Sequence, residues 1–246
     1  MENRKRAASE AQSAEAGVLN TVLFDLDGTL ADTAPDLAYA LNCVLQQQGR
    51  APLPYELIRP VVSHGGAALI SLGFGIGPEH ADYPDLRAEL LRIYQENLSR
   101  DTRLFPGMSE LLEALEARGL RWGVVTNKPA WLTDPLMQQL GLDARARCVI
   151  SGDTTANRKP HPEPMLLACQ RAGSDAADCL YVGDAARDVE AGRNAGMYTA
   201  VALFGYLDAQ DTPERWGADL MISHPRELLP WIDVQRRRRN HSNMPA

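Results

Sequence analysis

Six short apolar runs with the composition of β-strands alternate along this chain with segments that have the periodicity of α-helices. The runs are residues 21–26, 121–127, 147–153, 179–184, 199–203 and 219–223. Their Val, Ile and Leu content is typical of strands buried on both faces, as in a parallel sheet covered by helices. The alternation therefore predicts an α/β fold whose core is a doubly wound parallel, Rossmann-like sheet.

The stretch between the first two runs, residues 27–120, is too long for an ordinary strand–helix–strand crossover. Within it, residues 33–104 show helical periodicity and no convincing strand. We therefore expect an α-helical cap at 33–104, inserted into a core made of residues 18–32 and 105–233. The two ends, a lead-in at 1–17 and a basic tail at 234–246, are expected to be disordered.

Net charge indicates which kinds of partner the chain can bind, and cysteine spacing indicates the redox state of its thiols. The chain has 25 Lys and Arg against 32 Asp and Glu, a net charge of −7, which favours neither nucleic acid nor an anionic membrane. No run resembles a signal peptide or approaches the roughly 18 apolar residues of a membrane span. Its four cysteines lack CxxC spacing, as expected of reduced thiols. We expect a cytoplasmic monomer that binds a small molecule.

Polar side chains follow three of the predicted strands at the point where each strand ends. Asp25 and Asp27 end the first run, Thr126 and Asn127 the second, and Asp184 the fourth. Because ligands of parallel sheets bind at the carboxyl ends of the strands, we expect these side chains to share one rim. Carboxylate oxygens of this kind are hard ligands that suit Mg²⁺.

Two further features indicate phosphoryl chemistry rather than metal binding alone. Lys159 precedes a predicted helix and could neutralise phosphoryl oxygens, and the hydroxyl of Thr126 could bind them. A carboxylate such as Asp25 can attack phosphorus to form an aspartyl-phosphate. A second carboxylate two residues on, Asp27, can protonate the leaving alkoxide and then activate water.

Four motifs occur in order: DLDGT at 25–29, VVTN at 124–127, RKPHP at 158–162 and GDAARD at 183–188. Together they resemble the haloacid dehalogenase superfamily of phosphatases, over about residues 20–232. The resemblance implies a magnesium-dependent phosphatase acting on a small phosphoester. It implies that Asp25 is the nucleophile and Asp27 the general acid/base. It also implies that phosphate is bound by Thr126, Asn127 and Lys159, and magnesium by Asp25, Asp27 and Asp184. Asp188 would orient Lys159 or the water shell of the metal.

Alternatives remain open on the sequence. A dehalogenase would lack an acid at Asp27, because a halide leaving group needs no proton. A β-phosphoglucomutase-like mutase shares both aspartates and a helical cap. A receiver-type switch also accepts phosphoryl on Asp, but it is about half this length and has no inserted cap.

Within the phosphatases, the chain is most similar to the phosphoglycolate phosphatase group, and more closely to its bacterial branch acting on N-acetylmuramic acid 6-phosphate. The similar stretches, residues 121–129, 136–142 and 204–219, lie mostly in the core. Substrate choice is expected from the cap, where Ser63, His64, Gly65 and Gly66 form a candidate specificity loop, with Arg59 as a second basic residue. The same stretch could be an ordinary interhelical turn.

Overall fold

The core of the computed structural model, which describes residues 18–242, is a six-stranded parallel sheet in the order β5-β4-β1-β6-β7-β8. Its strands are β1 (Thr21–Phe24), β4 (Arg121–Val125), β5 (Val149–Ile150), β6 (Cys179–Gly183), β7 (Tyr198–Ala202) and β8 (Leu220–Ile222). Each lies within or overlaps one of the six predicted runs, so the predicted α/β, doubly wound fold is confirmed. The chain runs outward from β1 to β5 and then returns to β6, so the strand order reverses beside β1.

Helices cover both faces of the sheet. Successive residues of each strand point to opposite faces, so each strand contributes side chains to the packing on both sides. Val22 and Phe24 of β1 face one hydrophobic cluster, and Leu23 faces the other. The first cluster also contains residues of α6 (Met108–Ala117), α7 (Ala130–Gln139) and α10 (Leu228–Ser242), and the second contains residues of α8 (Glu163–Ala172) and α9 (Ala186–Asn194). Short 3₁₀ turns complete this part of the chain: η2 (Ala176–Asp178), η3 (Pro213–Arg215) and η4 (Pro225–Glu227).

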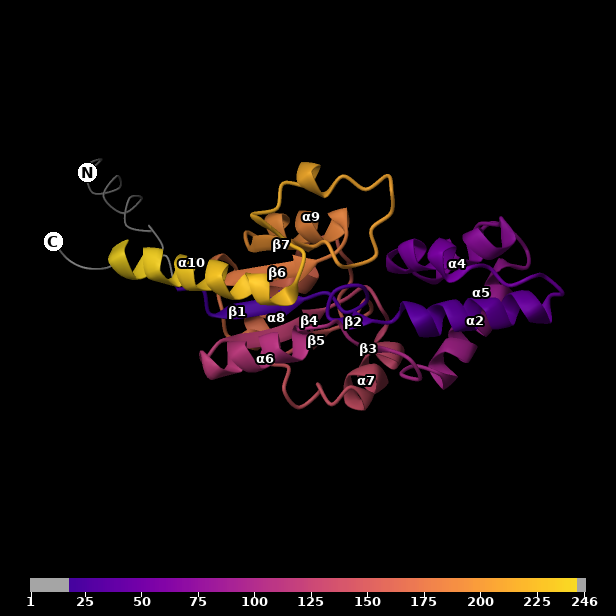
Figure 1. The fold of residues 1–246 in the computed structure, drawn as a ribbon, viewed down its shortest axis with the longest axis horizontal. Helices are drawn as coiled ribbons and strands as arrows, with labels where there is room; N and C mark the ends of the chain where they lie inside the picture. The colour runs from indigo at the N-terminus through magenta and orange to yellow at the C-terminus, as the bar shows by residue number, and fades with distance from the viewer. Residues whose placement is uncertain (1–17, 243–246) are drawn as a thin grey trace, which may run out of the picture.

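A group of helices, here called the cap, lies between β2 (Ala31–Asp32) and β3 (Arg103–Leu104) and sits at one end of the sheet (Figure 1). It consists of α2 (Ala34–Gln47), α3 (Tyr55–Ile58), η1 (Arg59–His64), α4 (Gly65–Phe74) and α5 (Tyr83–Glu96). β2 and β3 pair as an antiparallel ribbon, which the sequence did not predict. The ribbon brings the two connections of the cap together.

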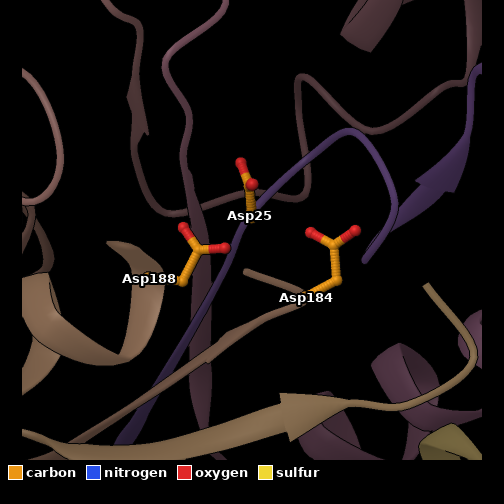
Figure 2. A group of neighbouring side chains, drawn as sticks. All are labelled: Asp25, Asp184 and Asp188. Carbon is orange, nitrogen blue, oxygen red and sulfur yellow. The ribbon is translucent and has the colours of Figure 1, made fainter. Parts of the chain in front are cut away.

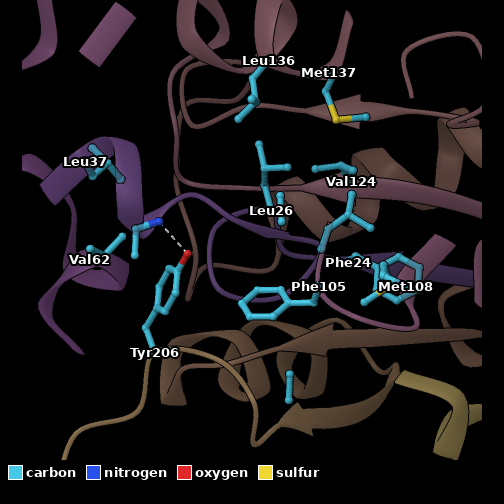
Figure 3. Packing of buried hydrophobic residues seen from close by; sticks show 14 of the residues in the cluster. Phe24, Leu26, Leu37, Val62, Phe105, Met108, Val124, Leu136, Met137 and Tyr206 are labelled. Carbon is cyan, nitrogen blue, oxygen red and sulfur yellow. Dashed lines mark hydrogen bonds between the residues drawn. The ribbon is translucent and has the colours of Figure 1, made fainter. Parts of the chain in front are cut away.

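Aromatic and polar contacts fix this junction to the core. The hydroxyl of Tyr206 donates to Asp32 Oδ1 at 2.8 Å. It also accepts from the backbone N–H of Ala34, the first residue of α2, at 2.8 Å, the bond drawn as a dashed line in Figure 3. The ring of Phe105 packs against that of Phe204 with 5.1 Å between centroids. Tyr206 is 2% exposed, so these polar contacts are shielded from water. The loop after β7 therefore holds the start of the cap.

One helical stretch within residues 18–242, Tyr55–Phe74, is long and apolar enough to cross a membrane by length and composition alone. It consists of α3, η1 and α4, with Pro60 in η1 and a φ of 77° at Gly65. Leu69 and Ile70 of this stretch are fully buried. Only 28% of its most apolar part is buried, but a single stretch of this kind is weak evidence for a membrane span, because helices of water-soluble proteins pass the same test.

The structure differs from the sequence prediction at the C-terminal end. Residues 234–242, expected to belong to a disordered tail, continue helix α10. Arg has a high helix propensity, so a run of four arginines can extend a helix that begins in apolar residues. The remaining residues of that tail, 243–246, and the lead-in at 1–17 lie outside the described residues.

Gly28 allows the chain to turn sharply after β1, and its replacement tests how tightly this turn is packed. Its φ is 82°, and a Cβ there would overlap Asp184 Oδ2 and lie 2.8 Å from Tyr206 Cδ2. Gly28→Ala should lose about 1–2 kcal/mol of unfolding free energy from the backbone conformation. The steric overlap should remove about 1–3 kcal/mol more.

Gly49→Ala is the matched control, because Gly49 has a φ of 69° and a Cβ there would have nothing within 4 Å. Urea unfolding of both variants should show the smaller backbone cost alone in Gly49→Ala. Equal losses in the two variants would mean that the packing around Gly28 contributes nothing.

Candidate active site

Three carboxylates gather at the carboxyl edge of the sheet (Figure 2). Asp25 follows β1, Asp184 follows β6, and Asp188 lies in the first turn of α9. One oxygen of each lies within 4.8 Å of the others, and none of the three residues is more than 4% exposed. Burial raises the pKa of Asp184 to about 7, and the charges of Asp188 and Asp25 act in the same direction. Burial also raises the pKa of Asp25, although Lys159 opposes it.

Lys159 is the cation that compensates this cluster. Its Nζ lies 2.9 Å from Asp25 Oδ1 and 2.8 Å from Asp188 Oδ1, and it donates to Tyr181 Oη at 2.8 Å. Burial alone would lower the pKa of Lys159, but Asp188 and Asp25 outweigh it and hold the pKa above its usual value. A lysine 4% exposed therefore stays charged between two carboxylates.

Asp27 lies outside the cluster of three carboxylates and has its own partners. Its Oδ1 accepts from Lys128 Nζ at 2.8 Å and from the hydroxyl of Thr33 at 2.6 Å. Lys128 also donates to the hydroxyl of Tyr94, on α5 of the cap, at 2.9 Å. The sequence prediction placed the Asp27 carboxylate among the metal ligands, and the structure does not bring it there. Lys128 was missed, although it follows the VVTN motif directly.

Thr126 and Asn127, both expected to bind phosphate, follow β4. The Thr126 hydroxyl accepts from the backbone N–H of Lys128 at 3.2 Å, and Thr126 lines the cavity beside Asp25. The side chain of Asn127 is used differently. Its Nδ2 donates to the carbonyl of Lys159 and its Oδ1 accepts from the N–H of Lys159, both at 3.1 Å. Asn127 therefore positions the backbone of Lys159.

The residues of the candidate specificity loop contact both the carboxylate cluster and the cavity. Ser63 donates its hydroxyl to Asp184 Oδ2 at 2.8 Å, and its carbonyl accepts from Arg187 Nη2 at 2.6 Å. Ser63, His64, Gly65 and Gly66 all line the cavity. The structure thus brings the loop to the carboxylate cluster, with Ser63 in direct contact.

Arg59 does not face the cavity as the sequence suggested. Its guanidinium donates to the carbonyls of Gly205 and Phe204 at 3.0 and 3.1 Å and lies 5.0 Å from the ring centroid of Tyr206. It fastens the cap to the core loop that also holds Asp184, since the backbone N–H of Tyr206 donates to Asp184 Oδ2 at 2.9 Å.

A cavity of about 790 Å³ lies between the cap and the sheet edge. Asp25, Asp27 and Thr126 line its core wall, and His64 and Arg87 are among the residues of its cap wall. Its volume falls within the range of small-molecule sites, roughly 300–1,000 Å³. The cavity thus joins a charged end at the sheet to a second wall supplied by the cap.

The carboxylate cluster fits a Mg²⁺ ion. Asp184 Oδ1 is buried and has no hydrogen-bond partner among residues 18–242, which is costly unless another group satisfies it. Asp25 and Asp188 supply further hard oxygens close by, and hard oxygens are what Mg²⁺ prefers. Asp25 and Asp184 have the positions expected of ligands, while Asp188 already pairs with Lys159.

This arrangement defines a class of enzymes, the hydrolases that handle phosphoryl groups at the edge of a capped parallel sheet. Residues 22–202 match the model of the haloacid dehalogenase-like hydrolases, and the chain belongs to this family. Relatives 43–45% identical to it and a structural neighbour from Haemophilus somnus are named as phosphatases, so the chain is an enzyme of the phosphatase class rather than a receiver-type switch.

Two relatives and one solved structure illustrate the similarity. The chain is 45% identical over 215 residues to the N-acetylmuramic acid 6-phosphate phosphatase of Pseudomonas putida, covering 87% of this chain and 96% of that protein. It is 44% identical over 216 residues to a phosphoglycolate phosphatase of Xylella fastidiosa, covering 87% and 93%. A crystal structure described as a predicted phosphoglycolate phosphatase from Haemophilus somnus has a TM-score of 0.77 at 27% identity, covering 87% and 97%.

The raised pKa of Asp184 predicts how Mg²⁺ stabilises the fold. Because its folded pKa of about 7 exceeds its ordinary 3.8, its contribution to folding is present below about pH 4 and lost as pH rises through about 7. Mg²⁺ needs the deprotonated carboxylate, so it should raise Tm more at about pH 8 than at about pH 5.5. Thermal unfolding with and without Mg²⁺ measures this difference.

Asp184→Asn is the control for that measurement, since an amide does not titrate. It should remove most of the Mg²⁺-dependent rise in Tm at both pH values. A rise in the parent protein that does not change between the two pH values would contradict the role given to Asp184.

Proposed function

We propose that this phosphatase is a Mg²⁺-dependent phosphomonoesterase that hydrolyses N-acetylmuramic acid 6-phosphate through an aspartyl-phosphate on Asp25. The observation that carries the proposal is the cavity of about 790 Å³, which joins Asp25 and Asp27 to a wall formed by the cap. A two-carbon acid would fill only a small part of such a volume, whereas an amino-sugar acid matches it better. The relative from Pseudomonas putida supports the same substrate.

Asp25 carries out the first displacement. One of its carboxylate oxygens attacks phosphorus, and the bond from phosphorus to the sugar C6 oxygen breaks. Lys159, 2.9 Å from Asp25 Oδ1, and the Thr126 hydroxyl bind the phosphoryl oxygens as their charge develops. Asp25 and Asp184 would hold Mg²⁺, which would supply charge neutralisation for the phosphoryl group.

Asp27 handles the protons. It lines the cavity beside Asp25, and its Oδ1 is held by Lys128 and Thr33, so its orientation is fixed. In the first step Asp27 gives a proton to the departing C6 oxygen. In the second step it takes a proton from the water that attacks phosphorus, which releases phosphate and regenerates the Asp25 carboxylate.

A second candidate substrate is 2-phosphoglycolate, because a relative of almost equal identity, from Xylella fastidiosa, is named for it. It would undergo the same two steps at Asp25 and Asp27. The two candidates therefore differ in what the cap must recognise and not in the chemistry. We further propose that the enzyme works as a monomer in the cytoplasm.

The substrate is tested by kcat/KM for N-acetylmuramic acid 6-phosphate and 2-phosphoglycolate at the same Mg²⁺ concentration and pH. We expect the sugar acid to be preferred by about tenfold or more, as a difference of roughly 1.4 kcal/mol in transition-state binding would give. Phosphate release identifies hydrolysis, whereas a mutase would return an isomeric phosphoester. Preference for 2-phosphoglycolate would overturn the substrate and leave the chemistry in place.

Asp25→Asn should fold normally and release no phosphate from either substrate, because an amide does not attack phosphorus. Its fold is checked by circular dichroism and by its urea midpoint. Asn is nearly isosteric with Asp, so a loss of activity in a folded variant reports the chemistry. Full activity in Asp25→Asn would contradict the aspartyl-phosphate mechanism.

Asp27→Asn should slow hydrolysis of the sugar phosphate by roughly 10²-fold or more, because general acid and base catalysis are both lost. An aryl phosphate, whose leaving group needs little protonation, should lose less in a single-turnover measurement of the first step. Identical losses for the aryl and sugar phosphates would show that Asp27 is not the acid.

A further inference from the structure

One face of helix α5 forms part of the cap wall of the cavity. Tyr83, Arg87, Leu91 and Tyr94 all line the cavity, and they are spaced by four, four and three residues. This spacing places them on one side of a helix. The opposite side carries Arg92, which pairs with Glu89 and Glu96 at the surface. Arg87 is thus turned toward the cavity by the register of the helix.

Arg87 differs from Lys128, Arg187 and Arg158, the other Lys and Arg residues of the cavity, because its side chain has no partner within the described part of the chain. Lys128 pairs with Asp27 at 2.8 Å, Arg187 donates to the carbonyl of Ser63, and Arg158 donates to the carbonyl of Gly152 at 2.6 Å. The Arg87 side chain makes no ion pair or hydrogen bond with any residue between 18 and 242 in the structure. Its five N–H donors are therefore available to a ligand.

The position of Arg87 is defined on the cap side. A Cβ built on Gly66, at the start of α4, would lie 3.9 Å from Arg87 Nε, so the guanidinium lies close to the backbone of the specificity loop. Arg59, the other arginine considered for this role, is held by the core loop. The cap wall therefore presents Arg87 and His64 as its basic side chains, and Arg87 is the one with fixed charge.

An exposed aromatic ring from the core lies at the same cavity. Trp131, on α7, lines the cavity and is 43% exposed, which is unusual for a side chain of its size. Its ring offers an apolar face with a polar edge, suited to a ring-shaped ligand with apolar and hydroxyl groups. The cavity thus combines an exposed aromatic ring and the guanidinium of Arg87 with the carboxylates of Asp25 and Asp27.

We infer that Arg87 is the specificity-determining residue that binds the substrate's carboxylate, with Trp131 contacting the sugar ring. The inference rests on the proposed function, since N-acetylmuramic acid 6-phosphate carries a lactyl carboxylate on a ring carbon remote from its phosphate. A guanidinium binds a carboxylate through two parallel hydrogen bonds, which a lysine cannot reproduce. The core wall then binds the phosphate, and the cap wall binds the carboxylate.

The test compares two substrates that differ only in this carboxylate-bearing group. N-Acetylglucosamine 6-phosphate has a hydroxyl where N-acetylmuramic acid 6-phosphate has the lactyl ether. Arg87→Gln should lower kcat/KM for the muramic acid phosphate about 10- to 100-fold, as expected for a charged hydrogen bond, mainly through KM. Its effect on the glucosamine phosphate should stay within about threefold. Arg87→Lys should fall between the parent and Arg87→Gln.

Two further variants complete the design. Arg92→Gln removes an arginine from the outer side of the same helix and should leave kcat/KM for both sugar phosphates unchanged. Trp131→Ala should lower kcat/KM for both sugar phosphates by a similar factor, because both carry the same ring.

The outcomes separate the inference from the proposed function. Equal losses for the two sugar phosphates in Arg87→Gln, or no loss in either, would overturn the assignment of Arg87 while leaving the substrate intact. A parent enzyme that does not hydrolyse N-acetylmuramic acid 6-phosphate would overturn both. Unchanged kcat/KM values in Trp131→Ala would overturn the ring contact.

Discussion

The concentration of buried carboxylates at the end of β1 and β6 is the constraint on which the rest of this structure depends. Asp25, Asp184 and Asp188 lie within 4.8 Å of one another in a site that excludes water. Such a cluster is unfavourable by desolvation and by repulsion between like charges. Lys159 offsets part of this cost through two ion pairs, and Asn127 holds its backbone in place. The unsatisfied charge that remains is what a divalent cation and a phosphoryl group can use.

The cap contacts the same groups, so closure of the cap and arrangement of the site are linked. Ser63 donates to Asp184, and Tyr94 reaches Asp27 through Lys128. Arg59 holds the core loop whose backbone at Tyr206 also donates to Asp184. Opening the cap would remove the hydrogen bond from Ser63 to Asp184 and the one from Lys128, the partner of Asp27, to Tyr94. A substrate that keeps the cap closed therefore also fixes the carboxylates that act on it.

Sequence patterns were sufficient to predict the position of a site residue where that position follows from the end of a single strand. Buried parallel strands place Asp25 and Asp184 at one edge, so motif order predicted their convergence with Lys159. The pairing of Lys128 with Asp27 depends on the path of the loop after β4, which no local pattern encodes. The β2–β3 ribbon has two residues on each side, too few to show an alternating pattern. The direction of Arg59 likewise could not be predicted, because an arginine at the start of η1 can face either the ligand or the core.

In the proposed function, chemistry and selectivity come from different walls of one cavity, so identity to relatives does not decide the substrate. Asp25, Asp27 and Thr126 belong to the core wall of the cavity. In the proposed mechanism, any phosphomonoester that reaches them meets the same nucleophile and the same acid. Relatives named for a sugar acid phosphate and for phosphoglycolate are almost equally identical to this chain. The difference between two such substrates is a difference in binding free energy on the cap side. Arg87, which pairs with no other residue between 18 and 242, supplies that difference, because its guanidinium forms charged hydrogen bonds only with a substrate that carries an anion on the cap side.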